Sequence, residues 1–388
     1  MTTTRTRRLA GAALLSLTLL ACGTPDEPED VPHGYVAGAE ELPEAQTTIA
    51  YAARDGRRLH LLDLATGSQK PIDLTVSART ISEDGRFVYV HDGDRRLEIV
   101  DTGVWTVDHT DHVHYYRAPA RSLGVLTADA TITTVAGFGA HTTVGTADGT
   151  ITVLDRRELE SGAIVKLTEI DSRSATALAV PYADGLLVAA GDDPTKPADR
   201  IVAMDADGRE TGALRAPCPT PGAWVTLRAG AIIACDNHLV RVKLDNDRLT
   251  AKALPAPDVP GHFGYRPRSN EAAAAGRTGI LSVHASQATV RHLPAAGRRI
   301  VAAASPADGT TVLALDRSGT LLSYDLETGR ILAEKPLRAA GLTLDINRAY
   351  LPEPAARVIH EIDYRDGLRT ARTLPATEQP DLMVELGR

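Results

Sequence analysis

One short pattern recurs along most of the chain after residue 47. It consists of an apolar strand, a turn of Asp, Gly or Asn, and a second strand of alternating residues. Its eight copies begin at Tyr51, Val88, Thr143, Leu187, Ile232, Ala273, Val312 and Tyr350, in steps of 37 to 55 residues. These steps are close to the ~40–50 residues of one four-stranded propeller blade. Alternation with period two and Asx-Gly turns indicate strands, so we predict an all-β fold, a single β-propeller.

The number of hairpins favours eight blades, with seven as the alternative if one hairpin is irregular. Two stacked β-sandwiches are the other architecture compatible with the pattern. Almost nothing precedes the first hairpin that can serve as an innermost strand, whereas an apolar segment at 381–386 follows the last one. We expect this C-terminal strand to complete the first blade, because an unclosed array exposes strand edges. The propeller domain is predicted to span residues 47–388.

The first 22 residues have the pattern of an export signal. Three arginines precede an apolar run at 9–21, which ends on Leu19-Leu20-Ala21-Cys22. As a helix this run is about 20 Å long at ~1.5 Å per residue, shorter than the ~30 Å hydrocarbon core. Its ending matches the bacterial lipobox. We predict a lipoprotein signal peptide at 1–21, a lipidated Cys22 with a tether over 22–46, and an extracytoplasmic protein anchored to the outer face of the cell membrane. An ordinary secretory signal is the alternative.

Two further cysteines bear on the cross-links of the fold, and the net charge bears on the class of partner. Cys218 and Cys235 are an even pair in a compartment predicted to be oxidising, so we expect a disulfide, with a two-cysteine metal site as the alternative. The formal net charge is −8 and 43% of residues are apolar. Such a chain is neither a typical nucleic-acid binder nor a disordered protein. We therefore expect no nucleic-acid partner, and a membrane contact through the lipid anchor only.

A cluster of histidines suggests a metal site. His109, Asp111, His112 and His114 fall within six residues of one another, inside the longest of the steps between hairpins. The cluster is therefore expected in an insertion that projects from one face of the ring. Imidazole and carboxylate groups suit Zn²⁺, which takes four such ligands at ~2.0–2.2 Å. The alternative is a solvated polar loop with incidental metal affinity.

Other candidate residues are isolated. His141 precedes a strand expected near the central channel, and His262 lies in a Gly-rich loop; a lone histidine is more often structural than a ligand. The chain has no Gly-x-Ser-x-Gly elbow, no phosphate-binding Gly-rich loop and no His-Glu-x-x-His motif. We therefore expect that the protein is not an enzyme. A metal-dependent propeller hydrolase, such as a lactonase, is the third possibility.

Several strings together resemble the AztD-type zinc metallochaperones. They are 32–41, 101–117, Ala140-His141, Cys218-Pro219 with Cys235, 358–367 and 385–388, and the most specific is the Asp-His-x-Asp-His-x-His-Tyr-Tyr run at 108–116. The resemblance implies an extracytoplasmic β-propeller that binds Zn²⁺ and passes it to the solute-binding protein of a zinc ABC transporter. It also implies that 109–114 is a metal-binding flap and that His141 is a ligand candidate at the propeller face.

The chain departs from this family at one position. Where the family has Cys-Pro-Gly-Leu-His-Gly, this chain has Cys218-Pro219-Thr220-Pro221-Gly222-Ala223, so Gly222 replaces an expected histidine. The protein is then expected to keep only the flap site, to recruit His262, or to bind more weakly. We expect a monomer whose zinc binding weakens below about pH 6.5, because each imidazole must be neutral to bind. The alternative function is a surface-anchored protein-interaction propeller without a functional metal site.

Overall fold

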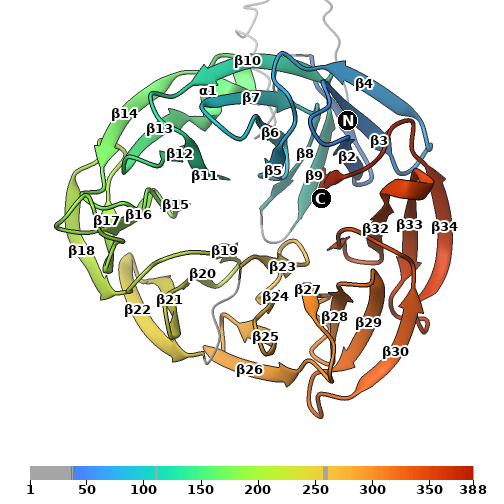
Figure 1. Cartoon of the computed structure of the whole chain (residues 1–388). Coiled ribbons are helices and arrows are strands. Elements are labelled where there is room, and N and C mark those ends of the chain that lie inside the picture. Colours follow the sequence, from blue (N-terminus) through green and yellow to red (C-terminus); the bar gives the residue numbers. More distant parts are fainter. Residues whose placement is uncertain (1–35, 37, 110–111, 257–260, 388) are drawn as a thin grey trace, which may run out of the picture. The chain divides into compact units, whose positions relative to one another are not determined.

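Four-stranded antiparallel sheets succeed one another along the chain and are arranged around a common axis (Figure 1). This computed structural model describes residues 36, 38–109, 112–256 and 261–387. Six sheets are separate, and two more are joined into one eight-stranded sheet by the parallel pairing of their innermost strands. The described residues therefore form eight blades, and the predicted all-β propeller with eight rather than seven blades is confirmed.

Each blade has four strands, which are named in order from the axis outward. The first two blades are β35 (Leu382–Leu386), β2 (Thr48–Ala52), β3 (Arg58–Asp63), β4 (Gln69–Asp73), and β5 (Thr80–Glu83), β6 (Phe87–His91), β7 (Arg96–Asp101), β10 (Arg121–Thr127). The third and fourth are β11 (Ile132–Phe138), β12 (His141–Thr146), β13 (Thr150–Asp155), β14 (Lys166–Asp171), and β15 (Ala179–Tyr182), β16 (Gly185–Ala190), β17 (Arg200–Met204), β18 (Glu210–Pro217).

The second half of the ring repeats the arrangement. The fifth and sixth blades are β19 (Trp224–Leu227), β20 (Gly230–Ala234), β21 (His238–Asp245), β22 (Arg248–Pro255), and β23 (Phe263–Tyr265), β24 (Glu271–Ala275), β25 (Gly279–His284), β26 (Thr289–Pro294). The last two are β27 (Ile300–Ser305), β28 (Thr311–Asp316), β29 (Thr320–Asp325), β30 (Ile331–Pro336), and β31 (Thr343–Leu344), β32 (Ala349–Glu353), β33 (Val358–Asp363), β34 (Arg369–Pro375).

The eight hairpins read from the sequence are the second and third strands of the eight blades. The first blade confirms the predicted closure, because β35 pairs with β2 from Leu386 opposite Thr48 to Leu382 opposite Ala52. The C-terminal strand thus supplies the innermost position that the N-terminal part of the first blade lacks. Among the described residues, helix is limited to α1 (Arg156–Ser161) and a 3-10 turn, η1 (Pro354–Ala356). Neither has the length or the apolar character needed to cross a membrane.

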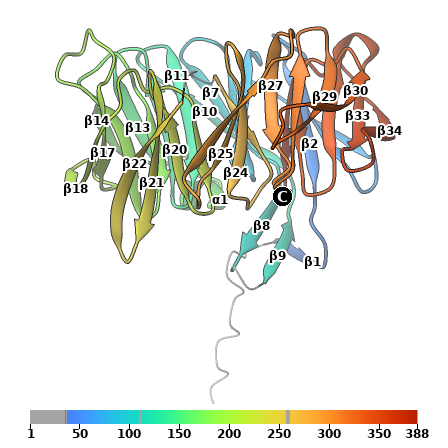
Figure 2. The same cartoon turned by 90° about the horizontal axis from the view of Figure 1, so that it is seen from below.

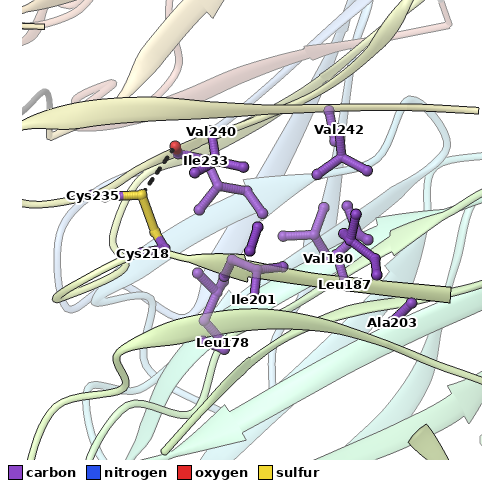
Figure 3. Packing of buried hydrophobic residues seen from close by; sticks show 14 of the residues in the cluster. Leu178, Val180, Leu187, Ile201, Ala203, Cys218, Ile233, Cys235, Val240 and Val242 are labelled. Carbon is purple, nitrogen blue, oxygen red and sulfur yellow. Dashed lines mark hydrogen bonds between the residues drawn. A yellow bond between two sulfur atoms is a disulfide. The ribbon is translucent and has the colours of Figure 1, made fainter. Parts of the chain in front are cut away.

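The core consists of apolar clusters, several of which lie between neighbouring blades. Figure 3 shows one of them, in which Leu187 and Ile201 of the fourth blade pack against Ile233 and Val240 of the fifth. Its members are small or aliphatic, as expected from the 4% aromatic content. Each fully buried aliphatic side chain contributes roughly 1.5–3 kcal/mol, so the ring is held mainly by many such contacts between sheets.

The predicted disulfide is present at the edge of this cluster (Figure 3). Cys218 follows β18 and Cys235 follows β20, and their sulfurs are bonded at 2.03 Å. The hairpin of β19 and β20 brings them together, as the sequence suggested. Because both sulfurs are used in this bond, the alternative of a two-cysteine metal site is wrong.

One extra sheet lies outside the ring. Strands β8 (Val104–Asp108) and β9 (Val113–Arg117) are inserted between the third and fourth strands of the second blade, and β1 (Glu40–Leu42) pairs with β9. Figure 2 shows this three-stranded sheet projecting from one face of the ring. The expected insertion is confirmed, and it explains the longest step between hairpins.

The N-terminal predictions have a mixed outcome. Residues 1–21 and Cys22 lie outside the described residues, so the signal peptide and the lipid anchor stay predictions. The predicted tether, 22–46, is not a plain spacer throughout, because its residues 40–42 form β1. Pairing with a strand about 70 residues further along the chain left no local signal in that segment.

Candidate metal centre

The histidine cluster occupies the tip of the inserted hairpin, which comprises β8, β9 and the turn between them. The strands pair from Val104 opposite Arg117 to Asp108 opposite Val113. His109 donates its backbone N–H to the carbonyl of His112 at 3.0 Å, which closes the turn. Asp111, a predicted ligand, lies outside the described residues. The turn therefore places His109 and His112 beside the first residues of β9.

Three imidazoles converge at this tip. His109, His112 and His114 each offer one ligand atom, and these atoms all lie within 4.8 Å of one another. The rings of His109 and His112 are stacked with centroids 4.9 Å apart, whereas the ring of His114 is nearly perpendicular to both. Within the described ranges, this histidine trio is the one group of at least three His, Cys, Asp or Glu side chains that fits a metal ion.

The spacing of the trio suits a borderline-soft ion. Two nitrogen ligands of a tetrahedral Zn²⁺ site, each about 2.05 Å from the ion, lie ~3.4 Å apart. The ligand atoms of the trio lie within 4.8 Å of one another, so small rotations of the three rings can bring them to this spacing. Three neutral nitrogen ligands leave a fourth position for a further side chain, water or a ligand from another protein.

A carboxylate from β1 holds one of these histidines. Oε1 of Glu41 lies 2.7 Å from Nδ1 of His114. Glu41 pairs in register with Tyr116, two residues beyond His114, so the two side chains are diagonal neighbours on one face of the sheet. An ionised carboxylate can only accept a hydrogen bond. When Nδ1 of His114 carries the proton that Glu41 accepts, Nε2 is the ring nitrogen left to bind an ion.

An aromatic column supports the same face of the hairpin. The ring of His114 stacks on Tyr116, and Tyr116 stacks on Trp105, which lies opposite it in the register. The guanidinium of Arg86 lies 3.9 Å from the centroid of the Trp105 ring. Burial, together with the nearby carboxylate of Glu41, raises the pKa of Tyr116. Tyr116 thus stays neutral, and the column connects the histidine trio with the body of the second blade.

Polar contacts fix the hairpin to other blades. Arg117 donates to Asp63 of the first blade at 2.6 Å. Partial burial raises the pKa of Asp63, but hydrogen bonds from the Thr66 backbone and from Arg117 outweigh it and hold that pKa below its usual value. At the far end of β8, Asp108 lies 4.0 Å from Arg268, which follows β23. The tip of the hairpin therefore reaches the sixth blade, opposite the blade from which it starts.

Two further predicted ligands lie elsewhere. His141 begins β12 and is buried; burial lowers its pKa, although Asp155 opposes the effect. His262 directly precedes β23, and loss of hydration next to the protein lowers its pKa, although the carboxylate of Glu83 in the second blade opposes the effect. Both side chains favour the neutral form that binds metals. The structure does not group either of them with the histidine trio, and their role as ligands stays a prediction.

Gly222 stands where the AztD resemblance led us to expect a histidine, and there is space for a side chain at this position. Gly222 precedes β19 and donates its backbone N–H to the carbonyl of Ala234 at 2.9 Å. A Cβ added at Gly222 would meet no atom within 4 Å. Nothing local therefore excludes a side chain here, and the structure gives no steric reason for the glycine.

Sequence reasoning missed three residues that build the site, namely Glu41, Trp105 and Arg86. Glu41 and Arg86 contact the hairpin through tertiary structure rather than through their neighbours in the chain, whereas Trp105 belongs to β8 of the hairpin itself. For Trp105 the sequence contained a weak indication of a structural role, because alternation along β8 places it on the same face of the strand as Val107. For Glu41 the interpretation of 22–46 as a tether hid the strand altogether.

An eight-bladed propeller with a three-histidine hairpin over one face defines a class of ring-shaped protein whose candidate metal site lies outside the ring. Two solved structures of AztD from Citrobacter koseri, one of them apo, are similar to this chain in fold, with a TM-score of 0.74 at 16% identity over 88% of this chain and 98% of theirs. The dihydro-heme d1 dehydrogenase NirN in complex with DHE has a TM-score of 0.56, at 14% identity over 93% of this chain and 82% of its own.

These likenesses show the fold, and the chain has an AztD-type fold over most of its length. No protein-family model and no curated protein matches the chain. The resemblance read from the sequence strings is thus confirmed at the level of architecture.

Proposed function

We propose that this protein captures Zn²⁺ outside the cytoplasm and transfers it to the solute-binding protein of a zinc ABC transporter. Zinc is then cargo rather than a resident cofactor, and the protein performs no catalytic step. The observation that carries the proposal is the convergence of three imidazole ligand atoms within 4.8 Å at the tip of a projecting hairpin. The AztD-type fold and the AztD-like strings at 101–117 support it.

The location of the trio suits transfer between proteins. His112 is exposed and the other two imidazoles are partly exposed, so a recipient protein can approach the ion directly. A tetrahedral ion held by three protein nitrogens has one position that a ligand of the recipient can occupy. Ligands can then be exchanged one at a time, without release of the ion to water.

The compartment follows from two features. The Cys218–Cys235 disulfide is typical of proteins in oxidising surroundings. The lipobox ending at Cys22 then anchors the protein to the outer face of the cell membrane, close to the transporter that it serves. Mass spectrometry of the mature N-terminus tests for the diacylglyceryl group on Cys22.

Zinc stoichiometry and affinity test the proposal most directly. Chelator competition compares the parent with the triple variant His109→Ala, His112→Ala, His114→Ala. A matched control changes His238, His284 and His292, which lie on the outer strands of the fifth and sixth blades, to alanine. We expect tight binding by the parent and the control, and the loss of at least one site with a 100-fold or greater weakening in the hairpin variant.

The contrary result is equally informative. Equal and weak zinc binding by all three proteins contradicts the proposal and favours a surface-anchored protein-interaction propeller. If the parent binds tightly, transfer is tested by mixing the zinc-loaded protein with the candidate solute-binding protein in the presence of excess chelator. Direct transfer proceeds faster than capture by the chelator, whereas release into solution does not.

A further inference from the structure

We infer that Glu41 is a positioning residue of the metal centre, and that it selects the Nδ1–H tautomer of His114 so that Nε2 faces the ion. The inference deepens the proposed function and rests on it. It gives strand β1, which precedes the propeller in the chain, a direct part in zinc binding.

The contact itself is short and specific. Oε1 of Glu41 lies 2.7 Å from Nδ1 of His114, within the range of a charge-assisted hydrogen bond. The side chain of His114 is 26% exposed and that of Glu41 is 45% exposed. The pair is therefore partly shielded, and the histidine is the better covered of the two. A carboxylate at this distance leaves only one ring nitrogen of His114 for a metal.

The register of β1 shows why Glu41 rather than Glu40 makes this contact. Glu40, Glu41 and Leu42 pair with Arg117, Tyr116 and Tyr115 of β9. Side chains alternate between the faces of a strand, so Glu41 lies on the face of His114 and Tyr116, whereas Glu40 points to the other face. The two neighbouring glutamates carry the same charge and both are exposed. Glu40 is therefore a matched control for charge, chain position and strand.

The chemistry of zinc sites explains what Glu41 contributes. A histidine ligand that donates its other N–H to a carboxylate is held in one tautomer and one ring orientation, and it becomes a stronger electron-pair donor. Without that partner, His114 at the tip of a hairpin divides its population between two tautomers and several rotamers. Only a fraction of that population presents Nε2, and the apparent affinity for the ion falls accordingly.

Strand β1 lies within the predicted tether, 22–46, so part of this segment is paired with β9. The segment 43–47 connects β1 to β2, so the strand that carries Glu41 belongs to the stretch between the predicted lipidated cysteine and the ring. Glu41 reaches His114 only while β1 is paired with β9. Loss of the pairing between β1 and β9 would therefore remove the contact between Glu41 and His114.

The experiment compares the parent with Glu41→Ala, Glu41→Gln and Glu40→Ala. Zinc affinity is measured by chelator competition. The His114 tautomer is measured on the metal-free protein at pH 8 by long-range ¹H–¹⁵N NMR of ¹⁵N-histidine-labelled protein, with His114→Gln to assign the signals. We expect about tenfold weaker binding in Glu41→Ala, a smaller loss in Glu41→Gln, and parent values in Glu40→Ala. The Nδ1–H tautomer should dominate in the parent and become a mixture in Glu41→Ala.

Each other outcome is decisive. Unchanged affinity in Glu41→Ala overturns the inference. Weaker binding with an unchanged His114 tautomer also overturns it, because Glu41 then acts through strand pairing alone. A parent that fails to bind zinc refutes the proposed function, while the tautomer comparison on the metal-free proteins still tests the contact between Glu41 and His114. Equal losses in Glu40→Ala and Glu41→Ala assign the effect to surface charge and contradict a positioning role.

Discussion

Arg86 shows how a single residue ties the metal hairpin to its blade. It is one of the most deeply buried side chains, and it donates to both carboxylate oxygens of Asp101, at 3.1 and 2.9 Å. Its guanidinium also covers the face of Trp105. Removal of a guanidinium from water is costly, and the paired carboxylate and the aromatic face offset that cost. The base of the hairpin is therefore rigid, whereas its tip carries the exchangeable ligands.

Loss of Asp101 should thus destabilise the protein strongly. Asp101→Ala removes the carboxylate that accepts both hydrogen bonds of the buried Arg86 and leaves the guanidinium with only the Trp105 ring and a 4.0 Å ion pair to Glu160. We expect the free energy of unfolding to fall by about 3–5 kcal/mol in urea denaturation. Asp73 is the control, because its ion pair with Arg58 is exposed and Asp73→Ala should cause no measurable change. Similar stabilities for the two variants would mean that the Arg86–Asp101 pair contributes little to the fold.

Strands and turns separate the disulfide from the metal site. In an antiparallel blade the connections alternate between the two faces of the ring. The inserted hairpin joins a third strand to a fourth, whereas Cys235 lies between the second and third strands of its blade. The two features therefore lie on opposite faces. The disulfide stabilises the junction of the fourth and fifth blades and does not contact the histidine trio.

Because of this separation, removal of the disulfide should lower the free energy of unfolding but leave the zinc affinity unchanged. The disulfide joins cysteines 17 residues apart in sequence. Its removal in the double variant Cys218→Ala, Cys235→Ala should lower the free energy of unfolding by about 3 kcal/mol, through the greater entropy of the unfolded chain. Zinc affinity, measured by chelator competition at a temperature where both proteins are folded, should remain at the parent value. A marked loss of zinc binding would show that the two faces are coupled.

On the scale of the whole ring, closure joins the two ends of the propeller chain. Leu386 in β35 is fully buried against the first two blades, and β35 occupies the innermost position beside β2. The pairing removes the open edge that a linear array of blades would expose. The ring is therefore expected to unfold as one unit, because opening at this seam removes support from both neighbouring blades.

A buried leucine in β35 and an exposed leucine elsewhere test how much the pairing of β35 with β2 stabilises the ring. Leu386→Ala removes a side chain with no exposed surface, so we expect a loss of about 2–5 kcal/mol. Leu332 in the outermost strand β30 is 58% exposed, and Leu332→Ala should stay within roughly 0.5 kcal/mol of the parent. Trp105 reports on the inserted hairpin where it packs on Arg86 of the second blade, and Trp224 reports on the fifth blade; both should lose their native fluorescence in one transition. Separate transitions would show that closure does not couple the blades.

Much of this architecture could be read from the sequence alone. The period-two alternation and the Asx-Gly turns are local signals, and their return at steps of 37 to 55 residues predicts the hairpins, the blades and the closing strand. The inserted segment was visible as an overlong step, and its histidines as a dense cluster. The cysteine pair was readable because a short hairpin lies between the two residues. Apart from the closing strand, whose partner β2 lies at the other end of the propeller chain, these features depend on residues close together in the chain.

Tertiary structure decided how the metal centre is held. Glu41 meets His114 across 73 residues, and Arg86 meets Trp105 beneath the hairpin. Asp108 reaches Arg268 from the opposite blade. A single sequence carries no information on strand register between distant segments, and a slip of one residue would turn Glu41 away from His114. The pattern of residues along the chain was enough to predict His109, His112 and His114 as candidate ligands, but the packing of distant segments sets which nitrogen of His114 contacts Glu41, because that orientation depends on contacts that form only when the ring has folded.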